Sequence, residues 1–230
     1  MIDHASTPAA VSSVYDQAVQ EEGFSETHRY LLQQIPPNCR VLELGPASGY
    51  MTRALAERGC QVDAIELNEM DAQKAAPFCH RLIVGSAEEE ASFSSLQGPY
   101  QVALMADILE HLRQPEKTLQ RIRHLLAPEG LALVSLPNIV YWRMRLEFLR
   151  GRFEYTDMGT LDRTHLRFFT LHTAAAMFKA AGFRVEKVET PTPQEASWRT
   201  LKQWLRAIAP SLFAFNFVFH LRLAGRESQA

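Results

Sequence analysis

The stretch Arg40-Val-Leu-Glu-Leu-Gly-Pro-Ala-Ser-Gly49 reads as a buried strand, a tight turn and the first turn of a helix. A second apolar run ends in Glu66, seventeen positions past Gly49. Gly45, Ala47 and Gly49 keep side chains out of the turn, so a ligand can lie against bare backbone while Glu66 reaches a ribose diol. The pattern predicts a nucleoside-cofactor site, and an ordinary strand–turn–helix of an α/β core is the alternative.

The spacing of the turn favours a cofactor without phosphate. A pyrophosphate is held by a turn of the form G-x-G-x-x-G, whereas this turn is G-x-A-x-G, followed by Tyr50. Glu43 stands at the mouth of the turn, where a carboxylate repels phosphate and attracts an ammonium group. S-adenosylmethionine carries an adenosine, an ammonium, a carboxylate and a sulfonium, so the turn favours it over NAD.

The segment Glu43-Leu-Gly-Pro-Ala-Ser-Gly49 resembles the first motif of the class I S-adenosylmethionine-dependent methyltransferases. Further segments agree in order, namely Ile65-Glu66, Val84-Gly-Ser-Ala-Glu88, Asp107-Ile-Leu-Glu-His111 and Leu126-Ala-Pro-Glu-Gly130. The match covers about residues 25–190. Within the class, the chain resembles a bacterial subgroup associated with polysaccharide and natural-product pathways. It is also similar to the ubiquinone-pathway O-methyltransferases and the methionine-biosynthesis W proteins.

The resemblance implies a position for each part of the cofactor. The methionine part lies near Glu43 and the glycines, the ribose on Glu66, and the adenine near residues 87 and 88. The predicted cofactor-binding residues are Glu43, Gly45, Ala47, Gly49, Glu66, Leu67, Ala87, Glu88 and Asp107. Many members carry an acid where Ser86 stands, so Ser86 or Glu88 is expected to accept the adenine amino hydrogen bond.

Short aliphatic runs alternate with longer helical patterns, which is typical of parallel βαβ units. We expect strands near 40–44, 62–66, 82–85, 101–106 and 131–136, and helices near 25–34, 49–58, 69–76, 116–126 and 171–181. The alternating segments 183–189 and 215–222 suit a strand pair at a sheet edge. With the resemblance, this predicts an α/β fold with a Rossmann-like seven-stranded, mostly parallel sheet, one antiparallel strand and helices on both faces.

The run Asp107-Ile-Leu-Glu-His111 follows the fourth expected strand, where open α/β sheets bind ligands. If a helix begins there, Asp107, Glu110 and His111 share one face. His111 is the candidate general base. The run also resembles the acid-x-x-Glu-His run of the ubiquinone-pathway enzymes, which is associated with a magnesium site. We predict no metal, with a divalent ion on these three residues, or a structural role beside the cofactor, as alternatives.

A second polar cluster, residues 161–170, lies among hydrophobic residues, where unpaired polar groups are costly. His165 is predicted as a second catalytic residue, and Asn138, Arg163 and Arg167 as substrate-binding residues. An ion pair of Asp162 with an arginine, holding the connection to the sheet, is the alternative.

We expect one methyltransferase domain over residues 1–230, with 1–24 as an N-terminal extension and with 138–170 and 192–210 covering the acceptor side. Residues 195–210 carry basic side chains together with Trp198 and Trp204, so peripheral membrane contact through this segment is a secondary expectation. A lid or core-packing helix is the main expectation for them.

The composition limits the classes of partner and the cellular compartment that we expect for the protein. The 230 residues carry a net charge of −2 with mixed signs, which gives no nucleic-acid footprint. The three cysteines form no C-x-x-C pair, which favours thiols in a reducing compartment. No signal-peptide pattern and no apolar run long enough to span a bilayer are present, so we expect a cytoplasmic protein.

These expectations combine into a cytoplasmic S-adenosylmethionine-dependent methyltransferase. The most favoured reaction is O-methylation of a small hydroxylated acceptor, a sugar or a phenolic. One alternative is a metal-assisted O-methyltransferase of the quinone-pathway type. Another is a non-catalytic partner protein that keeps the fold, like the methionine-biosynthesis W proteins.

Overall fold

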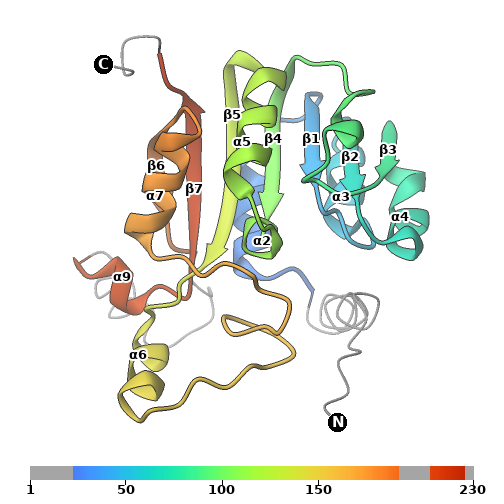
Figure 1. The fold of residues 1–230 in the computed structure, drawn as a ribbon. Coiled ribbons are helices and arrows are strands. Elements are labelled where there is room, and N and C mark those ends of the chain that lie inside the picture. The colour runs from blue at the N-terminus through green and yellow to red at the C-terminus, as the bar shows by residue number, and fades with distance from the viewer. Residues whose placement is uncertain (1–22, 192–207, 226–230) are drawn as a thin grey trace.

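The computed structural model describes residues 23–191 and 208–225, which form a sheet flanked by helices (Figure 1). Seven strands are arranged in the order β3-β2-β1-β4-β5-β7-β6. Strand β7 runs antiparallel to both of its neighbours, β5 and β6, and the other pairs are parallel. The strands are β1 Arg40–Leu44, β2 Gln61–Glu66, β3 Arg81–Val84, β4 Tyr100–Ala106, β5 Leu126–Pro137, β6 Phe183–Glu189 and β7 Asn216–Leu223. This confirms the predicted Rossmann-like sheet.

The central strands are buried on both faces, as parallel strands covered by helices must be. On β4, Val102 and Leu104 belong to one hydrophobic core, whereas Ala103 and Met105 belong to the other. Helices α5 (Pro115–Leu125) and α7 (Leu171–Ala180) pack on the second of these cores, and α2 (Glu26–Gln34) and α3 (Tyr50–Ala56) pack on the first. Helix α4 (Glu69–Ala75) contacts β2, β3 and α3.

The strand order positions the site. The chain runs from β1 outward through β2 to β3 and then returns to pair β4 with β1. At such a switch point, the loops after the two central strands diverge and leave a crevice at their carboxyl ends. The turn at residues 45–49 and the run at 107–111 therefore meet at one edge. The connection after β5 passes across the same edge (Figure 1).

Several elements differ from the expected ones. Strand β5 begins at Leu126, five residues earlier than predicted. The shared helical face considered for residues 107–111 does not form, because Asp107 adopts a φ of +50° and only a 3₁₀ turn, η3 (Leu109–His111), follows. The connection after β5 contains an unpredicted helix, α6 (Trp142–Leu149). The remaining short elements are η1 (Ala76–Phe78), η2 (Glu90–Phe93) and α9 (Pro210–Phe213).

Some expectations fall outside the described residues. The N-terminal extension up to residue 22, and residues 192–207 with Trp198 and Trp204, are not described. Among the helices of residues 23–191 and 208–225, none has the length and apolar character needed to cross a bilayer. The cysteines are free thiols, of which Cys39 and Cys60 are buried.

Candidate active site

The turn after β1 has the left-handed backbone that its glycines predict. Gly45, Ala47 and Gly49 have φ values of +64°, +50° and +85°. A Cβ on Gly49 would lie 2.7 Å from the backbone Cα of Ala75 in α4. Gly49 therefore lets α4 approach the turn, a packing role that the sequence did not reveal, in addition to its backbone conformation.

Two carboxylates stand at this turn. Glu66 Oε2 accepts a hydrogen bond from the backbone N–H of Ala47 at 3.0 Å, and its Oε1 accepts one from Asn68 at 2.8 Å. Glu43 accepts a hydrogen bond from Thr52 Oγ1 at 2.7 Å. Burial raises the pKa of Glu66, and burial raises the pKa of Glu43 to about 7 although the Thr52 hydrogen bond lowers it. A cationic group placed beside these acids would favour their ionised forms.

The segments predicted to contact adenine lie at the carboxyl ends of β2 and β3. Leu67, directly after Glu66, leaves 65% of its surface exposed, which is unusual for leucine and suits contact with a flat apolar ring. The carbonyl of Ala87 accepts a hydrogen bond from Thr118 Oγ1 at 2.8 Å. Glu88 Oε1 accepts one from the backbone N–H of Gln114 at 2.7 Å. Glu88 therefore also supports the start of α5.

Asp107 lies at the end of β4 and is held from two directions. Its backbone N–H donates to Ser135 Oγ at 2.9 Å, and Asn216 Nδ2 donates to its Oδ1 at 3.3 Å. Burial raises the pKa of Asp107 to about 6. These contacts connect Asp107 to β5 and β7.

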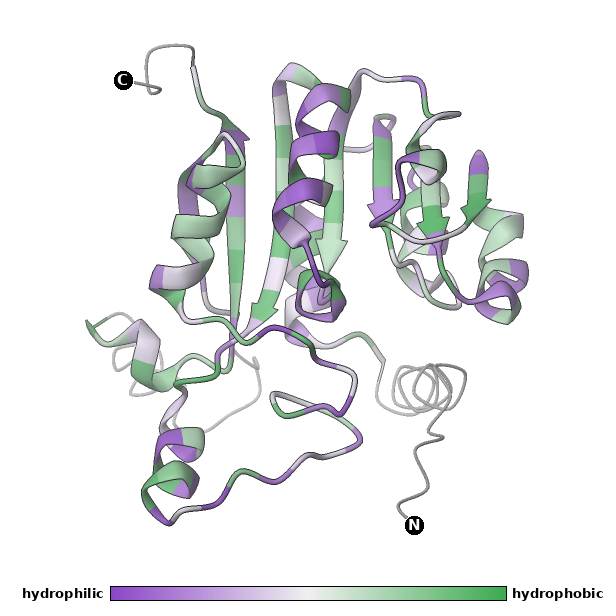
Figure 2. Cartoon of the chain, in the orientation of Figure 1, coloured by the Kyte–Doolittle hydropathy of each residue, from purple (hydrophilic) through white to green (hydrophobic). Residues whose placement is uncertain are grey.

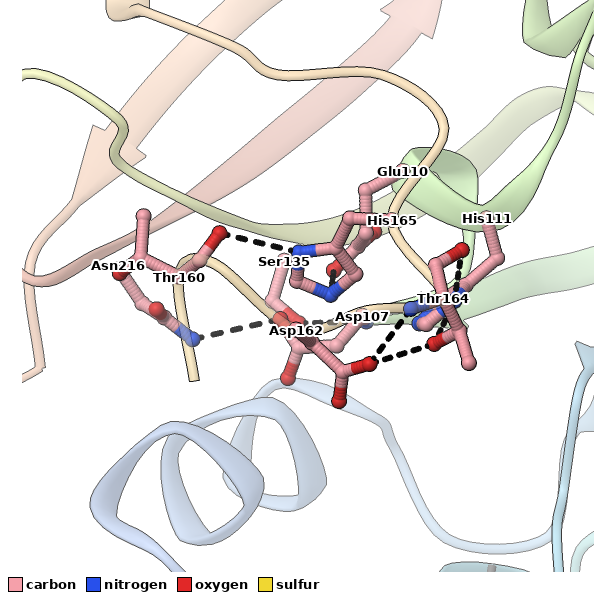
Figure 3. A network of polar contacts seen from close by, with 9 residues as sticks. All are labelled: Asp107, Glu110, His111, Ser135, Thr160, Asp162, Thr164, His165 and Asn216. Atoms are coloured by element: carbon pink, nitrogen blue, oxygen red, sulfur yellow. Dashed lines mark hydrogen bonds and ion pairs between the residues drawn. The ribbon is translucent and has the colours of Figure 1, made fainter. Parts of the chain in front are cut away.

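Three other groups converge beside Asp107, as Figure 3 shows. Atoms of Glu110, His111 and His165 that can bind a metal lie within 4.8 Å of one another. The imidazole rings are 4.7 Å apart between centroids, and His165 Nε2 lies 4.0 Å from Glu110 Oε1. The backbone N–H groups of Leu166 and Arg167 both donate to the carbonyl of Glu110, at 2.8 and 3.0 Å. This anchor brings His165 to a residue more than fifty positions earlier in the chain.

The hydrogen bonds of His111 determine which ring nitrogen carries its proton. Nδ1 lies 3.3 Å from the carbonyl oxygen of Thr164 and 3.0 Å from Thr164 Oγ1. The carbonyl can only accept, and Thr164 Oγ1 donates its own hydrogen to Asp162 Oδ1 at 2.7 Å. His111 Nδ1 therefore donates, and Nε2 of the neutral ring keeps a free lone pair. His165 follows the same logic, because its Nδ1 lies 3.1 Å from the carbonyl of Thr160.

The pKa shifts in this cluster favour the uncharged forms of its side chains. Burial and the neighbouring His165 lower the pKa of His111 to about 4, and burial lowers the pKa of His165. Burial raises the pKa of Glu110 well above its usual value. Burial therefore favours the uncharged forms of both imidazoles and of Glu110 unless a cation lies beside them.

Buried polar atoms without a partner also gather here. Within the described part of the chain, six buried side-chain nitrogen or oxygen atoms have no hydrogen-bond partner, and four of them are Glu110 Oε1, Glu110 Oε2, Thr160 Oγ1 and Asn216 Oδ1. All four belong to residues of the network in Figure 3. Because unpaired buried groups cost about 1–3 kcal/mol each, their concentration indicates a site for a polar ligand.

The donor set also fits a divalent cation. Two imidazoles with free Nε2 atoms and one unpaired carboxylate are usual ligands for transition metals, and they are compatible with Mg²⁺ or Mn²⁺. The sequence pattern suggested Asp107, Glu110 and His111 as the alternative set of metal ligands. In the structure, His165 takes the place of Asp107 in this set. The sequence pattern missed it because His165 approaches through the tertiary fold.

The residues predicted to bind the acceptor have structural partners. Asn138 is fully buried, and both hydrogens of its amide are donated to carbonyls, those of Ser211 and Ala214, at 3.0 and 2.8 Å. This leaves Asn138 no side-chain donor for an acceptor. Its position ties the start of the connection to α9.

The two arginines point to neighbouring segments of the chain. Arg163 donates to Asp157 at 2.9 Å, and Arg167 donates to Glu116 of α5 at 2.8 Å and to the carbonyl of Arg113 at 3.1 Å. The Arg163–Asp157 pair is largely exposed and the Arg167–Glu116 pair is partly exposed, so each contributes at most about 1 kcal/mol. Arg163 and Arg167 thus pair with Asp157 and Glu116, and the predicted ion pair of Asp162 with an arginine stays a prediction. Thr160, Thr164 and Asn216 were not predicted, because isolated polar residues in loops or at the start of a strand carry no sequence pattern.

Known proteins resemble the chain over most of its length. Residues 15–188 match the model of a family described as a methyltransferase domain. The ubiquinone biosynthesis O-methyltransferase of Caulobacter sp. (strain K31) is 27% identical over 139 residues, covering 59% of this chain and 54% of the relative. The chain thus spans about half the length of the curated relatives it matches.

Solved structures share the fold at lower identity. A TehB-like SAM-dependent methyltransferase from Corynebacterium glutamicum has a TM-score of 0.63 and 14% identity, covering 94% of this chain and 100% of the other. The magnesium protoporphyrin IX methyltransferase of Synechocystis, solved with bound SAH, has a TM-score of 0.57 and 12% identity, with 97% and 90% covered. The chain therefore belongs to the methyltransferase domain family.

Proposed function

We propose that the protein transfers a methyl group from S-adenosylmethionine to a hydroxyl of a small acceptor, a sugar or a phenolic. The observation that carries this proposal is the fixed tautomer of His111. Its Nδ1 donates to Thr164, which leaves an unprotonated Nε2 in a buried site beside Glu110. A neutral imidazole nitrogen is the group needed to remove a hydroxyl proton during transfer.

Each part of the site then has a role in the reaction. The acceptor oxygen forms a bond to the methyl carbon as the bond from that carbon to the sulfonium breaks. The hydroxyl proton moves to His111 Nε2, and S-adenosylhomocysteine leaves. Alignment of the reacting atoms supplies about 7–11 kcal/mol in favourable cases, and a general base adds about 10²–10⁴-fold. The partnerless atoms Thr160 Oγ1 and Asn216 Oδ1 are available to other hydroxyls of the acceptor.

An acceptor screen tests this function. The purified protein is incubated with S-adenosylmethionine and panels of phenols, ortho-diphenols and sugars, and release of S-adenosylhomocysteine is measured. We expect turnover with members of a hydroxylated panel and none with their methyl ethers. Cofactor binding without turnover on any acceptor would instead favour a non-catalytic partner protein.

Metal-assisted O-methylation is a second candidate, favoured by the Glu110–His111–His165 cluster. Those three residues would hold the ion, which would lower the pKa of a bound acceptor hydroxyl. The relatives named as ubiquinone biosynthesis O-methyltransferases agree with an O-methyl product. Dialysis against EDTA separates the candidates, because it abolishes turnover in the metal-assisted reaction and leaves the rate unchanged with a histidine base.

The affinity for S-adenosylmethionine should rise with pH. The resemblance places Glu43 near the ammonium group, and its pKa in the free protein is about 7. Protonation below that value removes the charge that attracts the cofactor, so the Kd should fall about tenfold between pH 6 and pH 8. Titration calorimetry measures this change. The pKa of the neighbouring Glu66 is also raised, so Glu66 could contribute to the same pH dependence, and Glu43→Gln is the control. An equally steep pH dependence in this variant would contradict the role of Glu43.

Loss of the Thr164 hydroxyl should disturb the tautomer of His111. Thr164→Val removes the link between His111 Nδ1 and Asp162, and we expect kcat to fall about 10–100-fold, the usual scale for a residue that orients a catalytic group. Thr164→Ser keeps the hydroxyl and should retain most activity. Thr156→Val, which changes an exposed threonine of the same connection, is the control for general effects of the substitution. Equal rates for the Val and Ser variants would show that the hydroxyl does not position His111.

A further inference from the structure

The two buried cysteines lie next to each other at the amino edge of the sheet. Cys39 directly precedes β1 and Cys60 directly precedes β2, two parallel strands that lie side by side (Figure 1). The register pairs Arg40 with Gln61, and the backbone N–H of Gln61 donates to the carbonyl of Cys39 at 2.9 Å. The cysteines therefore occupy matching positions on neighbouring strands, which direct their side chains to the same face of the sheet.

The geometry of the pair suits a covalent bond between the sulfurs. The two Sγ atoms are 3.8 Å apart, and both thiols donate to the carbonyl of Pro36, at 3.1 Å from Cys39 and 3.4 Å from Cys60. A disulfide requires Cα atoms about 4.4–6.8 Å apart, and neighbouring strands are about 4.8 Å apart. Rotation of the side chains can therefore close the remaining gap between the sulfurs without movement of the strands.

The surroundings keep both thiols away from solvent. Each cysteine leaves 7% of its surface exposed and belongs to the hydrophobic core on one face of a sheet whose strands are largely hydrophobic (Figure 2). Burial raises the pKa of Cys39 to about 12, with a further contribution from Cys60, while the Arg58 guanidinium lowers it. Because the thiolate is the reactive form, we expect slow oxidation. A small uncharged oxidant suits such a buried pair better than a bulky disulfide.

We propose that Cys39 and Cys60 are a site of reversible oxidation at which hydrogen peroxide forms a disulfide between β1 and β2. One sulfur attacks a peroxide oxygen, the O–O bond breaks, and a sulfenic acid and a water are formed. The second sulfur then attacks the sulfenic sulfur, and a second water leaves. In total, two thiols and one peroxide give one disulfide and two waters, and a dithiol reductant restores the two thiols.

The cross-link closes a loop around the unit that contains the cofactor turn. Residues 40–59 lie between the two cysteines and include β1, the turn at residues 45–49 and α3. A disulfide mainly limits the freedom of the unfolded chain, so the folded protein should gain stability under oxidising conditions. The bond forms at the amino edge and the turn lies at the carboxyl edge, so the affinity for S-adenosylmethionine should not change. The modification does not depend on methyl transfer at His111.

Peptide mapping after mild oxidation tests the proposal. The full chain is treated with hydrogen peroxide and the remaining thiols are alkylated in denaturant. Digestion with trypsin then separates the three cysteines into peptides 30–40, 59–74 and 75–81. We expect a disulfide between the first two peptides and its loss after treatment with dithiothreitol. The melting temperature of the oxidised protein should lie about 5–10 °C above that of the reduced protein.

Cys79 supplies the matched control. Its Sγ donates to the carbonyl of Ala75 in α4 at 3.5 Å, and burial also raises its pKa to about 12. Cys79→Ser should form the same disulfide and gain the same stability. Cys39→Ser and Cys60→Ser should show neither change, and the melting temperature of each reduced variant shows that it folds.

Three results would overturn the proposal. The first is that peroxide gives no link between peptides 30–40 and 59–74 in the folded protein. The second is that this link forms only when the protein is oxidised in guanidinium chloride, because the folded geometry then plays no part. The third is that peroxide raises the melting temperature of Cys39→Ser as much as that of the unaltered protein.

Discussion

The substitution His111→Ala should lower kcat about 10²–10⁴-fold and leave the Kd of S-adenosylmethionine nearly unchanged. We expect this loss because Thr164 orients the His111 ring and leaves its Nε2 unprotonated, beside Glu110 and His165. The cofactor turn is built by other residues, so its affinity does not depend on this side chain. Steady-state kinetics on an acceptor found by the screen, with calorimetry for the cofactor, measures both quantities.

The control is His172→Ala, which changes an exposed histidine in the first turn of α7. It should behave like the unaltered protein. Measurements after EDTA treatment, with and without added Mg²⁺, then distinguish a base from a metal ligand. If His111→Ala keeps the full rate under every condition, both roles are excluded and the cluster is structural.

The substitution Gly49→Ala should destabilise the protein by about 2–5 kcal/mol, the sum of a left-handed alanine and an overpacked contact. Gly49 has a φ of +85°, and its added Cβ would lie 2.7 Å from the Cα of Ala75, which is backbone and cannot rotate away. This is a large part of the 5–15 kcal/mol that typically stabilises a domain. Chemical denaturation measures the loss.

Gly151→Ala separates the two causes. Gly151 also has a positive φ, +72°, but nothing lies within 4 Å of its Cβ position, so only the backbone strain of about 1–2 kcal/mol remains. If both variants lose the same free energy of unfolding, the contact between the turn and α4 does not require a glycine at position 49. Gly49 would then be needed only for its left-handed backbone conformation.

The cofactor half of the site could be predicted from the sequence because it depends on local pattern. The turn at residues 45–49 and the acid at Glu66 are encoded by short motifs that follow strands, and parallel strands bring their carboxyl ends to one edge. The strand pair after Gly182 was predictable from its alternation for the same reason. These features require no knowledge of long-range contacts.

The acceptor half depends on tertiary contacts that no motif encodes. His165 joins Glu110 because two backbone N–H groups bind the Glu110 carbonyl, and Thr164 selects the His111 tautomer through Asp162. Asp107 has a left-handed backbone, so no helix begins there, and the group with metal-binding geometry contains His165 in its place. Arg163 and Arg167 were expected at the acceptor because charges among aromatics suggest a site. Surface ion pairs with Asp157 and Glu116 explain them equally well.

The position of the transferred methyl group tests the central proposal most directly. The protein is incubated with S-adenosylmethionine that carries a deuterated methyl group and with an acceptor from the screen that also offers nitrogen and carbon nucleophiles. The product is then analysed by mass spectrometry and NMR. We predict a deuterated methyl group on oxygen, and its formation should be strongly reduced in His111→Ala. A methyl group on nitrogen or carbon, or an undiminished yield of the ether in His111→Ala, would contradict hydroxyl activation at the Glu110–His111–His165 cluster.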